Sequence, residues 1–163
     1  MSAQLHIERG AGLEAPDDES FRLWVSATCE FLDLKLAGEP ELSLKISDIP
    51  EMTQLNQRFR DRSGPTNVLS FPAELPADIE CALLGDIVIC APLVQKEAQE
   101  QGKTNQCHWA HLTIHGVLHL LGYDHQDDDT AQVMENLEIQ ILEQLGCPDP
   151  YIPGETAASR LAL

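Results

Sequence analysis

The spacing of apolar residues predicts several helices along the chain. Within residues 18–37, apolar side chains recur every three or four positions, as they do on one face of an amphipathic helix. A second helix is expected from Ile49 to about Arg60, because the proline at its second position suits a first helical turn. Three more helices are predicted at residues 91–101, 105–121 and 127–145, and the last of them ends at Gly146.

Alternating and continuous apolar stretches predict the strands. Residues 41–47 alternate between apolar and polar side chains, which is typical of a half-buried strand. Residues 83–89 form an apolar strand, and the shorter segments 5–8 and 67–71 complete the set. Because the strands come mostly early and the helices mostly late, this order favours an α+β fold. We expect a small mixed sheet of about four strands packed with about five helices.

The length of the chain limits its domain organisation. A chain of 163 residues can form one compact domain with a sizeable core, and it is too short for two. We expect a single domain over residues 1–151, packing that loosens after Pro148, and a loose tail over residues 152–163.

Several features of the sequence predict a cytoplasmic protein. No apolar run approaches the roughly 18 residues that a membrane span needs. The first residues, MSAQLHIERG, do not combine a basic start with an apolar stretch, as a secretory signal would. The five cysteines are scattered without a C-x-x-C pair, so we expect them to be reduced thiols that fill apolar space.

The charge of the chain restricts its partners. A net charge of −17 repels polyanions, so an RNA partner must be held by a local basic site or presented by another protein. The acidic surface can also serve solubility alone. The one dense basic spot is Arg58, Arg60 and Arg62, whose planar guanidinium groups match phosphate oxygens. Pairing with a helix C-terminus would explain one of these arginines, but not all three.

The segment HGVLHLLGYDH, residues 115–125, predicts a metal site. His115 and His119 are one helical turn apart, so both project from the same face. Gly122 permits a left-handed turn, which would bring His125 back as a third ligand. Three protein ligands with an open fourth position are typical of catalytic zinc sites. The alternative, that the histidines only pack on an apolar helix, explains this spacing poorly.

Other residues around this segment are candidates for supporting roles. His108 and His111 lie on the same helical stripe and are expected not to be ligands. His111 is expected one turn from the metal, as a supporting group or packed beside Trp109, and the alternative is that it competes with His115 as a ligand. Asp124 is a candidate for orienting an imidazole, because metal-bound histidines commonly donate their other N–H to a carboxylate. The run 127–129 is expected to cap the following helix.

Three characteristic segments follow one another along the chain: PTNVLSFP at residues 65–72, LLGDIVI at residues 83–89 and the histidine segment at residues 115–125. In this order they resemble the YbeY family of bacterial metal-dependent endoribonucleases. The similarity extends from the first helix to about Tyr151. It implies an α+β fold, one zinc ion per chain held by the three histidines of the last segment, and an essential arginine at Arg60. Gly64 departs from the family pattern, in which another basic residue often stands there.

The position of Gly116 bears on the reaction. Zinc peptidases with this histidine spacing carry a glutamate there as general base, and a glutamate at this position would be expected beside the metal-bound water. Peptide hydrolysis needs such a group to protonate the amine, whereas phosphodiester hydrolysis needs positive charge on the developing phosphorane, which Arg60 can supply. The sequence therefore favours phosphodiester over peptide bonds.

The resemblance implies a place in ribosome biogenesis. Family members act in maturation of ribosomal RNA, notably at the 3′ end of the small-subunit RNA, and in ribosome quality control. The implied partners are a ribosomal RNA precursor, the small ribosomal subunit and a ribosome-associated GTPase, with no membrane and no DNA. Two alternatives stay open: a metallopeptidase whose base is Asp124 or Asp86, and a non-catalytic assembly factor whose metal only braces the fold.

Overall fold

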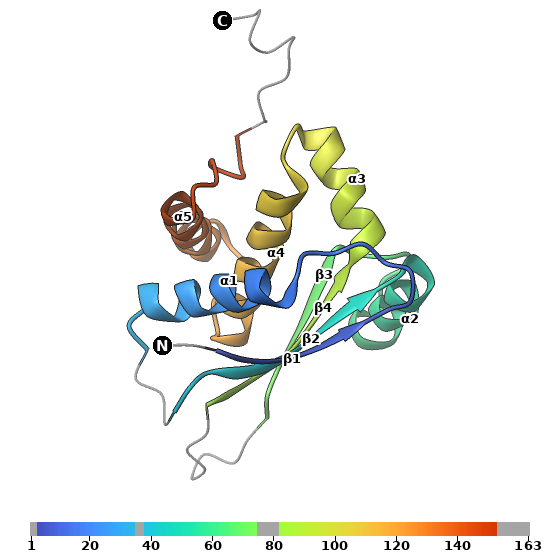
Figure 1. The fold of residues 1–163 in the computed structure, drawn as a ribbon, viewed down its shortest axis with the longest axis horizontal. Coiled ribbons are helices and arrows are strands. Elements are labelled where there is room, and N and C mark those ends of the chain that lie inside the picture. Colours follow the sequence, from blue (N-terminus) through green and yellow to red (C-terminus); the bar gives the residue numbers. More distant parts are fainter. Residues whose placement is uncertain (1–2, 35–37, 75–81, 153–163) are drawn as a thin grey trace, which may run out of the picture.

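The computed structural model describes residues 3–34, 38–74 and 82–152, and they form one sheet with helices on both faces (Figure 1). The strands join in the order β1-β2-β4-β3, with β1, β2 and β4 parallel and β3 antiparallel to β4. The predicted α+β class with a mixed sheet is confirmed. The elements are β1 (Gln4–Arg9), α1 (Asp18–Phe31), β2 (Glu41–Ser47), α2 (Ile49–Arg60), β3 (Val68–Pro72), β4 (Leu83–Cys90), α3 (Ala91–Gln101), α4 (Asn105–Leu120) and α5 (Asp128–Gln144).

The two faces of the sheet bury different sets of side chains. On one face, the alternating apolar residues of β2 and β4, such as Leu44 and Ile87, pack with α1, α4 and α5 in the main core. On the other face, a smaller cluster contains Met52 of α2 with Leu69 and Val88. Figure 1 shows α2 on the opposite side of the sheet from α1, α4 and α5. Helix α4 is therefore sandwiched within the domain, which explains why most of its residues are buried.

Helix boundaries follow the capping chemistry of the sequence, with one difference. Helix α1 was expected to reach residue 37 but ends at Phe31, because Asp33 adopts a left-handed conformation (φ 49°) that closes the last turn. The predicted cap of α5 is confirmed, since the Asp127 side chain accepts from the backbone N–H of Thr130 in a capping box.

A glycine in β4 permits the close pairing of β3 and β4. Gly85 has a φ of 141°, and a Cβ atom there would lie 2.2 Å from the carbonyl oxygen of Phe71. No L side chain fits that space without moving the backbone of β3. The pairing matters for function because β3 leads out of the arginine-containing loop toward the histidines.

The cysteine prediction is wrong for two of the five residues. Cys107, near the start of α4, is disulfide-bonded to Cys147, which follows α5. Cys29 and Cys90 are buried free thiols, as expected, and Cys81 lies outside the described residues. The sequence could not predict the bond because its partners are 40 residues apart and meet only when α4 and α5 pack together.

The chain after Pro148 also differs from expectation. Residues 148–152 have no regular secondary structure, yet Pro150 is buried and its carbonyl accepts a hydrogen bond from Lys103. The chain directly after Pro148 is therefore packed as far as Tyr151, contrary to the expectation of loose chain there. Of the predicted tail, residues 152–163, all but Ile152 lie outside the described residues. None of the described helices is both long enough and apolar enough to cross a membrane.

Candidate functional site

The C-terminal end of α4 and the turn after it bring three histidines together. His115 and His119 lie one turn apart and are half-buried, with ring centroids 4.7 Å from each other. Gly122 has a φ of 98°, so the expected left-handed turn is present. The turn returns the chain so that the exposed His125 ring lies 5.5 Å from the His115 ring and 5.0 Å from the His119 ring.

The donor set of this cluster fits a metal ion. Each histidine offers a ring nitrogen, and the three nitrogens lie within 4.8 Å of one another. Burial, reinforced by His115 and His125, lowers the pKa of His119 to about 4, so its ring is neutral near pH 7. A neutral imidazole carries the lone pair that a transition metal needs. Three imidazoles suit zinc and leave room for a further ligand.

The histidines form one wall of a cavity of about 400 Å³ that also contains basic residues. Arg60 lines it from the end of α2 and Arg62 from the following loop, together with other residues of this loop and of β3. Asp61 ends α2 in a left-handed conformation (φ 51°), and the Asn56 side chain donates to the Gly64 carbonyl, which shapes this loop. The structure thus brings two of the three predicted arginines to the histidines.

Arg58 lies elsewhere. Its guanidinium carbon is 5.2 Å from the centroid of the Phe59 ring, and Arg58 does not line the cavity. The helical spacing explains the separation, because residues 58 and 60 point about 200° apart around α2.

The cavity differs in charge from the rest of the chain. Although the net charge is −17, no aspartate or glutamate of the described residues lines this cavity. Of the two carboxylates considered as an alternative base, Asp86 lines a separate pocket with Lys45 and Phe71. The Asp124 side chain accepts a hydrogen bond from the backbone N–H of His125, at 2.7 Å. It was expected to orient an imidazole, but its described hydrogen bond is to this backbone group.

A buried glutamate behind the histidines was missed by the sequence analysis. Glu138 of α5 is fully buried, and its Oε2 lies 3.1 Å from Nδ1 of His115. Its Oε1 lies 2.5 Å from Nε2 of His111 and accepts from the Tyr151 hydroxyl at 2.6 Å. Burial alone would raise the pKa of Glu138, but the hydrogen bonds from the two histidines outweigh it and lower the pKa to about 2. The one available signal was a glutamate on the apolar face of α5, between Met134 and Ile141.

His111 and His108, the other histidines on this face of α4, each contact a carboxylate. His111 lies one turn from His115, and its Nε2 is 2.5 Å from Oε1 of Glu138. His108 is buried with its Nε2 2.8 Å from Glu97, and Glu97 also accepts from the Asn67 side chain. A second group of three possible ligands, His111, His115 and Glu138, shares His115 with the first group.

Gly116 faces the sheet instead of the cavity. A Cβ atom at this position would lie 3.0–3.1 Å from two methyl carbons of Ile87, which is tighter than an ordinary contact. A glutamate there would therefore point into the packed interface between α4 and β4, not beside the metal as expected from the sequence. The absence of a side chain is explained by helix–sheet packing.

We predict that Gly116→Glu destabilises the protein without creating a peptidase. Overpacking and burial of a carboxylate should together lower the free energy of unfolding by at least about 3 kcal/mol. Denaturant unfolding measures this loss, and Gly116→Ala, which adds only the tight Cβ, should lose much less. A Gly116→Glu protein as stable as wild type and able to cut casein would contradict the packing assignment.

Comparison with known proteins gives concordant matches. A family model described as "Endoribonuclease YbeY" matches residues 11–146. A relative named Endoribonuclease YbeY from Pseudomonas entomophila is 48% identical over 154 residues, covering 94% of this chain and 96% of the relative. Another of the same name, from Cellvibrio japonicus, is 50% identical over 149 residues, covering 91% of this chain and 82% of the relative. The solution structure of TM1509 from Thermotoga maritima has a TM-score of 0.58 and 27% identity, covering 87% of this chain and 89% of that chain.

Proposed function

Because this chain belongs to the YbeY endoribonuclease family, we propose that it is a zinc-dependent endoribonuclease that cuts single-stranded ribosomal RNA precursors. The observation that carries this proposal is a cavity lined by three histidine rings and two arginines, with no carboxylate among the described lining residues. Such a lining attracts a phosphodiester and offers no general base for a peptide.

The proposed metal ligands are His115, His119 and His125. When bound, a zinc ion supplies Lewis-acid chemistry, which makes water acidic enough to attack near neutral pH and polarises a phosphoryl oxygen. Arg60 is the proposed catalytic residue: its guanidinium group holds the phosphate oxygens and stabilises the charge that grows on them in the transition state. Arg62 lies in the same cavity and is proposed to bind an adjacent phosphate. Arg58, outside the cavity, is left with at most a peripheral role.

The shape of the cavity supports a single-stranded substrate. An RNA strand must bring one backbone phosphate into a space of about 400 Å³ between α2 and the histidine turn. Unpaired nucleotides can be splayed out to reach such a site, whereas a duplex presents its phosphates on a rigid surface. The proposed substrate is the precursor of the small-subunit RNA near its 3′ end, and the proposed wider role is ribosome quality control.

The surrounding charge supports delivery by a partner. A chain of net charge −17 gains little from long-range attraction to RNA, so the basic cavity must act after another component has placed the strand. We propose the small ribosomal subunit and a ribosome-associated GTPase as that component, with the protein working in the cytoplasm. In that reducing compartment the Cys107–Cys147 bond would be open to thiol reduction.

Cleavage of a defined precursor RNA, combined with metal analysis, tests the proposal. We expect the purified chain to contain one zinc ion and to cut a single-stranded small-subunit precursor near its 3′ end. Treatment with a chelator should remove both metal and cleavage, and added zinc should restore both. A protein that cuts casein in a chelator-sensitive way but leaves RNA intact would replace this proposal with the peptidase alternative. Full metal content without any RNA cleavage, even with small subunits present, would favour the assembly-factor alternative.

A further inference from the structure

The chain places a fully buried carboxylate directly behind the proposed metal ligands. Glu138 receives three hydrogen bonds: from His115, from His111 and from the Tyr151 hydroxyl. None of the three donors is a lysine or an arginine. Removing a carboxylate from water costs free energy. A carboxylate buried in this way is therefore expected to have a role in the molecule.

The geometry assigns the nitrogen through which the His115 ring contacts Glu138. A carboxylate oxygen accepts hydrogen bonds, so the ring nitrogen in contact with Glu138 is the one that donates. That nitrogen is Nδ1, at 3.1 Å from Oε2 of Glu138. The proton on Nδ1 leaves Nε2 as the lone-pair nitrogen of His115.

His111 obeys the same rule with its nitrogens exchanged. Its Nε2 faces Glu138 at 2.5 Å, so Nε2 carries the proton and Nδ1 holds the lone pair. Nδ1 of His111 is buried without a hydrogen-bond partner in the described structure. His111 is therefore a donor to Glu138 and a support for the carboxylate.

The distances among His111, His115 and Glu138 indicate a hydrogen-bond network and not a second metal site. Two ligand atoms on one zinc ion, each bonded at about 2.0 Å, lie about 3.3 Å apart in a tetrahedral site. Nε2 of His111 and Oε1 of Glu138 are only 2.5 Å apart, which is a hydrogen-bond distance. Hydrogen bonds thus account for the contacts among His111, His115 and Glu138, and no cation is needed between them.

The third donor comes from the segment that follows α5. Tyr151 is 45% exposed, yet its hydroxyl reaches Glu138 inside the domain, and its ring meets the His111 ring edge-on at 5.5 Å. The disulfide of Cys147 and the bond from Lys103 to the Pro150 carbonyl at 2.5 Å tie this segment to the domain. Within the segment, the Asp149 side chain accepts from the Tyr151 N–H.

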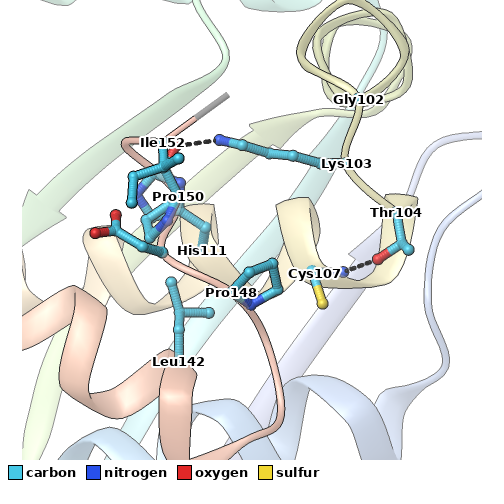
Figure 2. A pocket seen from close by; sticks show the side chains of 10 residues that line it. Gly102, Lys103, Thr104, Cys107, His111, Leu142, Pro148, Pro150 and Ile152 are labelled. Carbon is cyan, nitrogen blue, oxygen red and sulfur yellow. Dashed lines mark hydrogen bonds between the residues drawn. The ribbon is translucent and has the colours of Figure 1, made fainter. Parts of the chain in front are cut away.

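Figure 2 shows the segment beside the N-terminal half of α4, near Cys107 and His111. Lys103 extends from the turn before α4 toward Pro150 and Ile152, and His111 lies beneath the segment. Between them is a pocket of about 430 Å³, lined by His111, Leu142 and Pro148 among others. The segment, residues 147–152, therefore passes over this pocket to reach Glu138, and we call it the strap.

We propose that Glu138 is a positioning residue that fixes His115 with Nε2 free for the metal, and that Tyr151 holds Glu138 in place from the C-terminal strap. This inference rests on the proposed metal site and adds to it two residues that never touch substrate. The expected consequence is a site whose metal affinity depends on the strap formed by residues 147–152.

Zinc affinity of point variants tests the role of Glu138. We expect Glu138→Gln to weaken zinc binding by about 10- to 100-fold, the usual effect of removing a carboxylate behind a histidine ligand. The matched control is Glu143→Gln, an exposed glutamate of the same helix, which should bind zinc like wild type. Affinity is measured by competition with a chromophoric chelator on the full chain.

The strap is tested by Tyr151→Phe, which removes one hydroxyl from a half-exposed ring. Loss of one hydrogen bond of ordinary strength should weaken zinc binding by about fivefold. If Tyr151→Phe binds zinc as tightly as wild type, the strap has no part in the proposal. If Glu138→Gln binds zinc as tightly as wild type, the whole proposal is overturned. Wild-type protein that binds two zinc ions, one of which is lost in Glu138→Gln, would show a second metal site instead.

The tautomer itself gives a readout that does not depend on folding of a variant. Nitrogen-15 NMR of metal-free wild-type protein should show His115 protonated at Nδ1 and His111 protonated at Nε2. A His115 ring protonated at Nε2 would overturn the proposal, whatever the variants do. Failure of wild type to bind zinc at all, with His115 protonated at Nδ1, would instead reject the proposed function and leave the network in place.

Discussion

Replacement of His119 by alanine is expected to produce a protein that retains no zinc after purification and does not cut RNA. His119 is the central member of the cluster, because its ring is the closest neighbour of both other rings, at 4.7 Å from His115 and 5.0 Å from His125. Two remaining imidazoles cannot complete the three-ligand set of a catalytic zinc site. Metal analysis and cleavage of the precursor RNA measure the two losses.

The same variant should be less stable than the metal-loaded protein. An ion that binds only the native state stabilises it by mass action, by about 4 kcal/mol when its concentration is a thousand times the Kd. The variant should therefore unfold at a lower temperature than loaded wild type and at about the temperature of chelator-treated wild type. His6→Ala is the matched control, since His6 is an exposed histidine of β1 outside the cluster. Full metal occupancy in both His119→Ala and His125→Ala would show that the cluster is assigned wrongly.

Local signals in the sequence predicted the parts of the site that local structure determines. The ligand spacing in residues 115–125 requires only a helix and a left-handed glycine turn, and both are encoded by neighbouring residues. The position of α2 beside the site was also predicted from local signals, its apolar spacing and the proline in its first turn. The order of strands and helices likewise predicted the fold class.

Contacts between distant segments were beyond the reach of the sequence. Glu138 approaches His115 across 23 positions, and Tyr151 approaches His111 across 40. No local pattern distinguishes Glu138 from the exposed glutamates of α5 except its place on the apolar face. The direction in which Gly116 faces also depends on packing, because only the position of Ile87 on β4 shows that this side of α4 meets the sheet.

The positions of the three arginines depend on local sequence and also on the three-dimensional structure. Their density along the chain predicted a basic spot, but only the rotation of α2 and its left-handed end decide which side chains enter the cavity. Arg60 and Arg62 enter it, and Arg58 contacts Phe59. The three arginines are therefore close in sequence but separated in space, so Arg58 can serve as a control for Arg60.

Charge reversal at Arg60 is expected to abolish RNA cleavage while leaving the fold intact. Arg60 is exposed and lines the cavity, so Arg60→Glu should change the free energy of unfolding little. Loss of one group that stabilises transition-state charge typically lowers the rate by about 10²- to 10³-fold, and a negative charge in its place should lower it further. Single-turnover cleavage of the precursor RNA measures the rate, and thermal unfolding checks the fold.

Matched variants separate a catalytic role of Arg60 from loss of positive charge in general. Arg58→Glu makes the same change of net charge outside the cavity, so it should retain most of the cleavage rate. Arg60→Gln should also lose cleavage, and because it introduces no carboxylate near the histidines, its zinc content should equal that of wild type. Equal losses in Arg58→Glu and Arg60→Glu would mean that both act through long-range attraction, which added salt would screen in wild type as well. Cleavage at the wild-type rate by Arg60→Glu would transfer the phosphate role to Arg62, the other arginine that faces the histidines across the cavity.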